Sequence, residues 1–542
     1  MKQSFLGLVL VYVFYSCNPS ENPNEGNKFE SELDAIFAEF QNDASPGCAV
    51  AVFQGDKVVF QKGYGLANIE NKVPITTSTA FDIASVSKQF TAYAAALLLE
   101  QGKMSLTDDI RMYFPELTDF PHQITIDQLI HHTSGLRDWP QTLAVAGWSM
   151  EDELTYEQIL RMAFAQKDLN YEPGDEYSYT NTGYVLLAEL VSRVAEEPFH
   201  SHIEKVVFEP LGMKNSLFSH DIHNVIAAKA QSYYKADSAN YGSYANTTTA
   251  MGSSSMVSTV EDLARWLMFL SKNPADSPAV NRLHERGMLT NGDSIHYAYG
   301  VWFEESGGLP VITHTGSWAG FRAMTMRFPT KDFGLVILSN YAGFDRYGYA
   351  EKVAKAFLTD DYHLSDEKTD EPPLSDSYQR LAGAYVSSPT RIYELGSDDN
   401  PMKLSIDGAF EYTMVAADSE GEFFASEDHT LQLKQVSGTL SVNGATLEKL
   451  SPRHLPLGSY TGTYFSDELQ MTYQVVMEDE QLFMSSLRHG PVELRPIAGN
   501  LFAGGEWFLG RVLFTTTADG ISGFQVFGGR VRRLHFRKVQ SW

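Results

Sequence analysis

A short acidic segment divides this chain into two parts with different hydrophobic patterns. Residues 359–375 are rich in Asp, Glu, Pro and Ser, a composition typical of a solvated linker. A single hydrophobic core stops growing at roughly 250–300 residues, so a chain of 542 residues needs more than one. We therefore expect the first domain to end near residue 358 and further domains to follow the linker.

Before the linker, strand patterns flank a helix-rich middle. The helical segments are residues 29–40, 89–101, 184–195 and 260–270. The strand segments are residues 48–52 and 57–61 near the start, and 311–313, 321–328 and 334–339 near the end. This order predicts an α+β sandwich over residues 29–358, in which the first and last strands share one antiparallel sheet flanked by helices.

After the linker, the chain contains short alternating strand patterns and turns. Leu381-Ala-Gly-Ala-Tyr385 resembles Tyr460-Thr-Gly-Thr-Tyr464, and several strand-like runs follow each of them. We therefore expect two small antiparallel β-barrels, one over residues 376–452 and one over residues 453–542.

The N-terminus has the pattern of an export signal. Lys2 precedes an apolar run, Phe5 to Tyr15, that is too short for a stable membrane span. Cys17 ends the run, and the polar segment that follows it is typical of a bacterial lipoprotein. We expect a signal peptide over residues 1–17, lipidation of Cys17, and a tether over residues 18–28. The protein would then be exported and anchored to a membrane, facing the periplasm or the cell exterior, and Cys48 would have no cysteine partner.

Charge and apolar patterning restrict the partners. The net charge of −27 repels phosphate backbones, and no basic cluster overrides it, so we do not expect nucleic acid as a partner. After the N-terminus no apolar run is long enough to span a bilayer, so membrane contact is expected only through the lipid anchor.

Ser85 and Lys88 form an S-x-x-K pattern at the start of an apolar helix. Residues three apart lie on one helix face, which places the lysine amine beside the serine hydroxyl. A partly buried lysine with a lowered pKa can take the serine proton and so activate the nucleophile. A second S-x-x-K match, Ser365 to Lys368, lies in the acidic linker, where nothing would desolvate its lysine.

Tyr179 and Asn181 form a second pattern, Y-x-N. A tyrosine near positive charge can shuttle a proton, and an asparagine two residues later can hold a substrate carbonyl. Tyr244 and Asn246 match the same pattern, but they lie in a polar segment with no helix after it. We therefore favour Tyr179 and Asn181.

His314, Thr315 and Gly316 form the third pattern, on a predicted strand. The glycine lets a substrate approach the strand edge closely. The backbone N–H of Ser317 would then pair with that of Ser85 in an oxyanion hole.

These three patterns, in this order, resemble those of the serine penicillin-recognising enzymes related to class C β-lactamases. Three further segments are typical of that family, and the resemblance covers about residues 30 to 358. They are His131-His132-Thr133-Ser134-Gly135-Leu136, Phe208-Glu-Pro-Leu-Gly-Met213 and Ser258-Thr259-Val260-Glu261-Asp262-Leu263.

The resemblance implies a β-lactamase/transpeptidase-like fold and a role for each motif residue. Ser85 would be the acylated nucleophile, and Lys88 and Tyr179 would transfer protons. Asn181 and the strand at His314, Thr315 and Gly316 would hold the substrate. The substrate would be a small peptide, amide or ester.

His314 stands where the class C β-lactamases have lysine. A histidine is mostly uncharged at neutral pH, which makes a substrate carboxylate a less natural ligand there. Histidine at this place together with two C-terminal barrels is similar to the D-aminopeptidases, in which a loop of the last barrel reaches the active site. Gly504-Gly505-Glu506-Trp507 is our first choice for that loop.

Several alternatives remain open. The same fold could serve an esterase, a β-lactamase or a D,D-carboxypeptidase, because specificity depends on loops. A protein that only binds cell-wall peptides is a further alternative. Metal catalysis is the weakest alternative. The adjacent His131 and His132 cannot easily share one ion, and the sequence contains no H-E-x-x-H pattern. We expect no metal and no cofactor.

Overall fold

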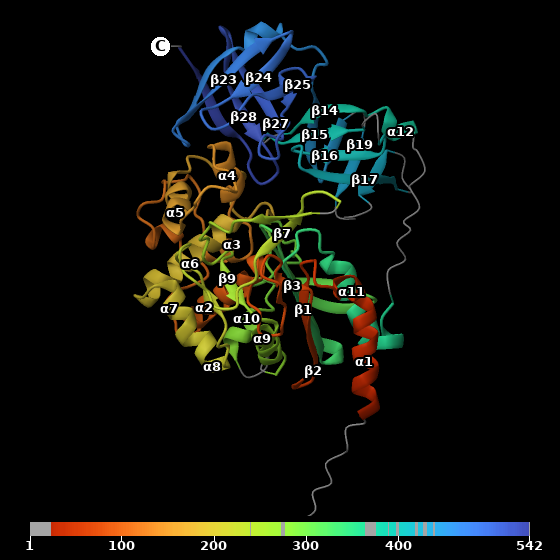
Figure 1. Ribbon diagram of the computed structural model, residues 1–542. Helices are drawn as coiled ribbons and strands as arrows, with labels where there is room; N and C mark the ends of the chain where they lie inside the picture. Colours follow the sequence, from red (N-terminus) through yellow and green to blue (C-terminus); the bar gives the residue numbers. More distant parts are fainter. Residues whose placement is uncertain are drawn as a thin grey trace, which may run out of the picture.

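A helix-rich domain and two β-barrels make up the structure (Figure 1). The computed structural model describes residues 23–238, 240–272, 277–363, 376–387, 390–396, 400–417, 421–425, 431–436 and 439–540. The expected signal peptide, Cys17 and the second S-x-x-K match lie outside these residues. Helix α1 (Pro23–Ile36) begins within the expected tether, and Phe29 stacks on Phe357 of the main domain.

The first domain is built on one antiparallel sheet of six strands. Their order is β10-β11-β12-β13-β1-β2. The strands are β1 (Cys48–Gln54), β2 (Lys57–Tyr64), β10 (Trp302–Ser306), β11 (Leu309–Trp318), β12 (Phe321–Phe328) and β13 (Phe333–Ser339). Because β1 pairs with β13, the first and last parts of the domain share this sheet, and the expected α+β sandwich is confirmed.

Helices cover both faces of the sheet. Ala49 and Ala51 of β1 face the larger core, which contains α2, α6 and α9, whereas Val50 and Val52 face α1 and α11 on the other side. Side chains alternate across a strand, so an apolar run is what a strand buried on both faces requires. The principal helices besides α1 are α2 (Lys88–Glu100), α6 (Asn181–Ala195), α9 (Val260–Lys272) and α11 (Arg346–Leu358).

Shorter elements complete the domain. The helices are α3 (Ile126–Ile130), α4 (Trp139–Val145), α5 (Tyr156–Ala165), α7 (Phe199–Ile203), α8 (Glu209–Leu211) and α10 (Pro278–Arg282). The strands are β3 (Leu66–Asn68), β4 (Val73–Pro74), β5 (Phe81–Asp82), β6 (Leu217–Phe218), β7 (Ser232–Lys235), β8 (Tyr241–Tyr244) and β9 (Met256–Ser258). Helix α12 (Asp376–Gln379) leads into the first barrel.

Two closed eight-stranded antiparallel barrels follow, as expected. The first contains β14 (Gly383–Val386), β15 (Ile392–Leu395), β16 (Lys403–Ile406), β17 (Phe410–Ala416), β18 (Glu422–Ala425), β19 (Gln432–Val436), β20 (Thr439–Val442) and β21 (Ala445–Lys449). The second contains β22 (Gly462–Ser466), β23 (Met471–Glu478), β24 (Gln481–Ser485), β25 (Val492–Ala498), β26 (Leu501–Ala503), β27 (Arg511–Thr517), β28 (Gly520–Phe527) and β29 (Leu534–Val539).

The internal similarity in sequence has a structural counterpart. The hydroxyl of Tyr385 donates to the carbonyl oxygen of Leu381 at 2.6 Å, and that of Tyr464 donates to the carbonyl oxygen of Tyr460 at 2.6 Å. The two barrels therefore begin with the same hydrogen-bonded corner.

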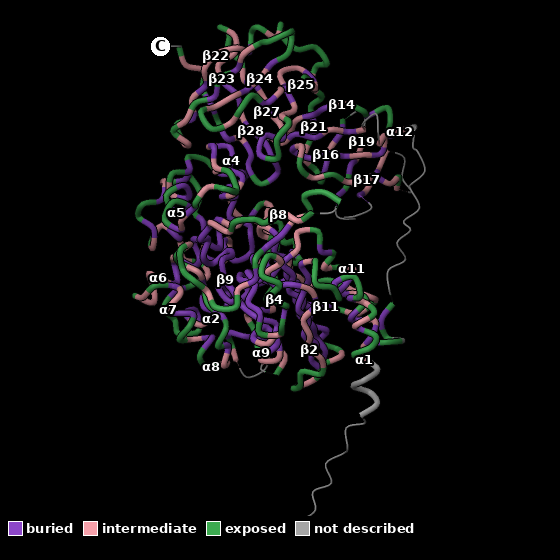
Figure 2. Tube along the Cα trace, viewed as in Figure 1, coloured by how far each residue is buried: buried purple, intermediate pink, exposed green. Residues whose placement is uncertain are grey.

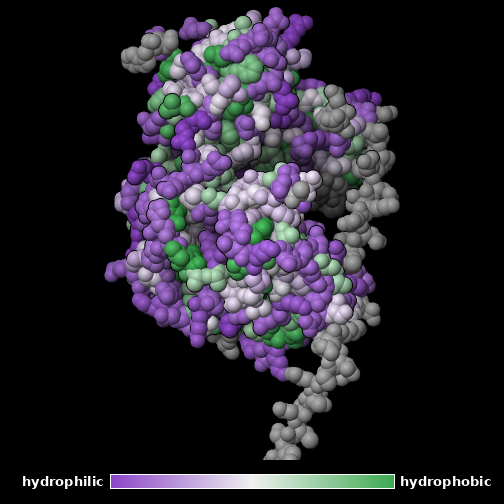
Figure 3. Space-filling model, viewed as in Figure 1, coloured by the Kyte–Doolittle hydropathy of each residue, from purple (hydrophilic) through white to green (hydrophobic). Residues whose placement is uncertain are grey.

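Ion pairs join the barrels to the first domain. The Glu176 carboxylate accepts hydrogen bonds from Arg391 of the first barrel at 2.9 Å and from Arg532 of the second at 2.8 Å. Arg137, which is fully buried, pairs with Glu468 of the second barrel at 2.9 Å. Figure 2 shows buried segments in the domain and in both barrels, and the face in Figure 3 is mostly hydrophilic. Within the described ranges, no helix has both the length and the apolar character needed to cross a bilayer.

Candidate active site

Ser85 lies in a tight turn that leads into helix α2. Residues Ala84–Ser87 form a 3-10 turn, and the α-helix begins at Lys88. Ala84 has φ +47°, in the left-handed region that non-glycine residues seldom adopt, and its N–H donates to the Asp82 carboxylate at 2.8 Å. The turn therefore holds Ser85 just ahead of the helix rather than within its first α-helical turn.

Lys88 is fully buried beside Ser85. Its amine lies 3.1 Å from the Ser85 Oγ, 2.8 Å from the Asn181 Oδ1 and 2.7 Å from the carbonyl oxygen of Ser253. Burial lowers the pKa of Lys88 well below its usual value, Arg530 lowers it further, and Asp138 opposes the shift. The geometry therefore favours a neutral amine within reach of the serine hydroxyl.

Tyr179 lies between the amine of Lys88 and the guanidinium of Arg530. The Lys88 Nζ is 4.9 Å from the centre of its ring, and the Arg530 Cζ is 5.0 Å from it. Its buried hydroxyl has no hydrogen bond of normal geometry to any described residue. Burial raises the pKa of Tyr179, and the nearby Ser85 hydroxyl and Arg530 oppose that shift. Tyr179 therefore presents a neutral phenol with an unused donor and acceptor.

Asn181 is oriented by Asp138, a residue that the sequence patterns did not single out. The Asp138 carboxylate accepts from the Asn181 backbone N–H at 2.6 Å and from its side-chain amide at 3.2 Å. Since these bonds fix the amide group, the Asn181 Oδ1 points to Lys88 and its amide nitrogen points to Asp138.

His314 is buried on strand β11 and uncharged. Its Nδ1 lies 2.7 Å from the carbonyl oxygen of Thr315, and its Nε2 lies 3.1 Å from the hydroxyl of Tyr297. Burial, with Lys88 nearby, lowers the pKa of His314 to about 3. A histidine in this state contributes no positive charge at neutral pH.

Gly316 is required by a close contact that the sequence did not reveal. A Cβ atom added there would lie 2.1 Å from the carbonyl oxygen of Ile83, so the close approach comes from the protein's own main chain. This packing sets strand β11 against the turn that carries Ser85. Thr315 and Ser317, on either side of the glycine, line the cavity beside Ser85.

The second Y-x-N match, at Tyr244 and Asn246, supports the site from outside the reacting groups. The side-chain amide of Asn246 donates to the buried Asp82 carboxylate at 2.7 Å, and its oxygen accepts from the Trp318 indole at 3.2 Å. Asn246 thus supports the turn before Ser85, whereas Tyr179 and Asn181 reach the serine and the lysine.

The two adjacent histidines have separate surroundings. The ring nitrogens of His131 lie 3.1 Å from the carbonyl oxygens of Asp127 and Glu285. The His132 ring packs against the Tyr179 ring at 4.3 Å. In the part of the chain that the structure describes, no three His, Cys, Asp or Glu side chains are grouped to hold a metal ion.

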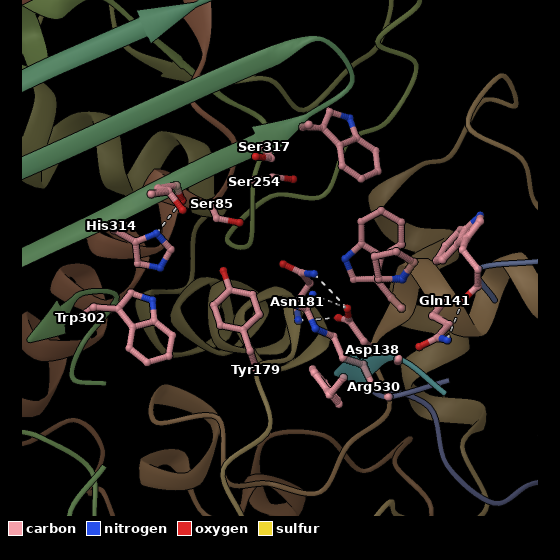
Figure 4. A pocket seen from close by; sticks show the side chains of 18 of the residues that line it. Ser85, Asp138, Gln141, Tyr179, Asn181, Ser254, Trp302, His314, Ser317 and Arg530 are labelled. Atoms are coloured by element: carbon pink, nitrogen blue, oxygen red, sulfur yellow. Dashed lines mark hydrogen bonds and ion pairs between the residues drawn. The ribbon is translucent and has the colours of Figure 1, made fainter. Parts of the chain in front are cut away.

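Most of the motif residues line one cavity of about 910 Å³; Lys88 and Gly316 are not part of its wall. His314 and Trp302 lie at one end and Asp138, Gln141 and Arg530 at the other, with Ser85 and Tyr179 between them (Figure 4). We call these the strand end and the barrel end. Glu304, on the same strand as Trp302, lines the strand end.

Both barrels reach the barrel end. Phe410 comes from the first barrel, and Trp507, Gly528, Gly529 and Arg530 come from the second. The loop we favoured contributes Trp507, but the turn between β28 and β29 is the one that reaches Tyr179. Its only sequence signal is the pair Gly528-Gly529 ahead of an arginine, which is too common to identify a site.

Comparisons with known proteins agree with this layout. The Beta-lactamase family model matches residues 33–358, more than half of the chain. Penicillin-binding protein 4* of Bacillus subtilis (strain 168) is 26% identical over 412 residues, covering 69% of this chain and 87% of that protein. Protein flp of Staphylococcus aureus (strain MRSA252) is 26% identical over 329 residues, 58% of this chain; the chain spans only 63% of that relative.

Solved structures that share the fold include a penicillin-binding protein homologue and a D-amino acid amidase. The octameric penicillin-binding protein homologue from Pyrococcus abyssi has a TM-score of 0.54 at 20% identity, covering 85% of this chain and 98% of that one. D-amino acid amidase from Ochrobactrum anthropi SV3, complexed with D-phenylalanine, has a TM-score of 0.51 at 23% identity, covering 61% and 99%. With the sheet, the barrels and the motif geometry, the family match establishes that this chain belongs to the Beta-lactamase family of hydrolases.

Proposed function

We propose that this protein is a serine hydrolase that forms an acyl-enzyme on Ser85. The observation that carries the proposal is the 3.1 Å separation between the Ser85 hydroxyl and the buried Lys88 amine. Burial of that amine lowers its pKa, so a neutral base lies beside the nucleophile. Metal and cofactor play no part in the proposed reaction.

Acylation would begin with proton transfer from Ser85 to Lys88. The serine oxygen attacks the substrate carbonyl carbon, and the resulting oxyanion is held by the backbone N–H groups of Ser85 and Ser317. Asn181 would bind the substrate on the other side of the cavity, with its amide fixed by Asp138. The positions of Ser317 beside Ser85 and of Asn181 against Lys88 support these roles.

Tyr179 would relay the serine proton to the leaving group: it donates its own proton, and the Lys88 ammonium, which lies over its ring, reprotonates the phenolate. Its buried phenol has no hydrogen bond of normal geometry to a described residue, so it is free to donate to a leaving amine or alcohol and to accept from an incoming water. Hydrolysis of the acyl-enzyme would then restore Ser85.

The proposed substrates are amides or small peptides, as in the D-aminopeptidases. A loop of the last barrel lines one end of the cavity, which favours small substrates over long chains. The neutral His314 offers no cation to a carboxylate at the strand end, which disfavours β-lactam and D,D-carboxypeptidase activity. An esterase on the same serine is the next alternative, and a protein that only binds cell-wall peptides is less favoured because the reactive groups are in contact.

We also propose that the protein is exported and anchored through a lipid on Cys17. This proposal depends on the sequence of the first residues. Labelling of intact cells with a radioactive fatty acid, with Cys17→Ser as the control, would test it directly.

The proposed chemistry is tested by release of p-nitroaniline from D-alanine p-nitroanilide and from its L-enantiomer, using protein that lacks residues 1–17. We expect turnover that Ser85→Ala abolishes, with the D form preferred. Turnover that persists in Ser85→Ala would contradict the nucleophile. Equal rates for the two enantiomers would leave Ser85 as the nucleophile but would contradict the proposed preference for D substrates.

A further inference from the structure

Arg530 brings a positive charge into the barrel end of the cavity. It follows Gly528 and Gly529 in the turn between β28 and β29 of the last barrel, and its side chain is 43% exposed. In Figure 4 the side chain lies near Asp138 and on the opposite side of Tyr179 from His314. The cation therefore comes from a different domain than the reacting groups.

The main chain of the turn that carries Arg530 is held in place by hydrogen bonds to the first domain. The carbonyl oxygen of Arg530 accepts from the Asp138 N–H at 3.2 Å and from the Asn170 side-chain amide at 3.0 Å. The Arg532 N–H donates to the Asn170 Oδ1 at 2.8 Å. A ligand that binds Arg530 would need to order only the side chain, which keeps the entropic cost of binding low.

Most of the donors of Arg530 are unused by the described residues. Its one ion pair there is a long one, 3.4 Å from the Nη1 to the Asp138 Oδ2. That carboxylate already accepts two hydrogen bonds from Asn181. An arginine fork can bind a carboxylate through two parallel hydrogen bonds. The Arg530 Cζ lies 5.0 Å from the centre of the Tyr179 ring, which leaves the fork available to a ligand.

Charge along the cavity is unequal at its two ends. Burial lowers the pKa of Lys88 and that of His314, so neither side chain competes strongly with Arg530 for an anion. Glu304 lines the strand end, and Asp138 is the carboxylate that faces Arg530. Trp139, Phe410 and Trp507 line the cavity and provide an apolar surround that strengthens an ion pair.

We infer that Arg530 is a specificity-determining residue that binds a carboxylate of the substrate at the barrel end. The preferred substrates would be amides or small peptides with an acidic group several bonds from the scissile carbonyl. A free ammonium at that end would face a guanidinium and bind poorly. The inference rests on the proposed serine hydrolase activity and adds an anionic group at the barrel end to the amide substrates proposed there.

The test compares three p-nitroanilides whose acyl tails differ in charge: glutaryl, pentanoyl and 4-aminobutanoyl. Rates are measured at the pH where each enzyme's rate no longer increases. We expect the wild-type kcat/KM to favour glutaryl over pentanoyl by about 10- to 100-fold, the value of a hydrogen-bonded charge pair. Arg530→Gln should remove that preference, and Arg530→Glu should favour 4-aminobutanoyl.

The matched control is Arg495→Gln, an exposed arginine on β25 of the same barrel, which should retain the preference. A wild-type enzyme that cleaves all three anilides equally, or an Arg530→Gln variant that still prefers glutaryl, would overturn the inference while leaving the hydrolase activity established.

A binding measurement separates the inference from the proposed function. If no anilide is cleaved, the amidase proposal fails, and tryptophan fluorescence of Ser85→Ala is titrated with glutaramate, since Trp139 and Trp507 line the cavity. We expect binding at least about 10-fold weaker when Arg530→Gln is added. Equal affinities would overturn the role of Arg530.

Discussion

The two ends of the cavity are built in different ways. The strand end and the reacting groups belong to one domain, where Ser85, Lys88 and His314 are set by a continuous core. The barrel end is assembled between domains, and ion pairs such as those of Arg391 and Arg532 with Glu176 hold it there. The proposed catalysis and the proposed substrate recognition therefore depend on different interactions.

The difference follows from what each task requires. A base with a lowered pKa requires burial, which only a packed core provides. A charged recognition group requires partial exposure and a fixed backbone, which a docked turn provides without disturbing the core. Changes at one end should therefore leave the other end largely intact.

The largest effect is expected from Lys88→Met at the reactive end. Removal of the base should lower kcat by about 10²- to 10⁴-fold, the usual contribution of general base catalysis. Because methionine fills the same buried space without a polar group, the midpoint of thermal unfolding should change little. A variant with more than one tenth of the wild-type kcat would show that Lys88 is not the base.

The next largest effect is expected from Asp407→Asn at the junction of the barrels. The buried Asp407 carboxylate lies 3.1 Å from the Arg391 Nε and 3.3 Å from the Arg532 Nε. Loss of its charge leaves two arginines with one shared partner, Glu176, and should cost about 3 kcal/mol of stability. Asn also adopts the left-handed backbone found there, φ +54°, so the turn is preserved.

Denaturant unfolding measures the cost, with the exposed Asp519→Asn as the control. Labelling of Ser85 by a fluorophosphonate should persist in Asp407→Asn even where substrate turnover falls. Loss of labelling together with turnover would mean that the barrels also position the nucleophile.

A smaller effect is expected at the repeated corners. Tyr385→Phe and Tyr464→Phe each remove one buried hydrogen bond of 2.6 Å. Each variant should lose about 1 kcal/mol of stability, measured by denaturant unfolding, and the two losses should be equal within error. Losses that differ severalfold would show that the two barrels are alike in topology but not in energetics.

The smallest effect is a shift of the pH profile. In the proposed mechanism the neutral form of Lys88 is the base, so activity should rise with pH through the pKa of Lys88. Arg530 lowers that pKa, and its removal favours the charged ammonium. Arg530→Gln should therefore move the rising limb of kcat/KM for the neutral pentanoyl anilide to higher pH. A limb that stays in place would mean that the two ends are not electrostatically coupled.

Much of the arrangement of the reacting groups could be predicted, because it depends on residues that are close together in the sequence. Lys88 follows Ser85 by three residues and Asn181 follows Tyr179 by two, so local structure sets most of each pair's geometry. Asp138 and Arg530 carry no such pattern. Asp138 looks like an ordinary residue ahead of helix α4, and its contact with Asn181 joins segments 43 residues apart.

The fold was predicted at the level of elements, and the differences are local. The chain order of strands and helices indicated one antiparallel sheet, and the similarity of residues 381–385 to residues 460–464, each followed by strand-like runs, indicated two barrels. Gly316 shows the limit of such reasoning. The sequence pattern singled out this glycine. It could not show that the Ile83 carbonyl oxygen, from a distant part of the chain, occupies the space beside it.

By itself, the sequence determined the nucleophile pattern, the α+β sheet and the two barrels, since each depends on residue types at short, regular spacings. The sequence indicated that His314 is mostly uncharged at neutral pH, and only the tertiary structure decided that burial lowers its pKa to about 3, because burial is a property of the whole domain. The tertiary structure also decided that a turn of the last barrel, rather than the loop at Trp507, brings a charge to Tyr179. Docking between domains depends on ion pairs between residues far apart in the chain, and no local pattern encodes which surfaces will meet.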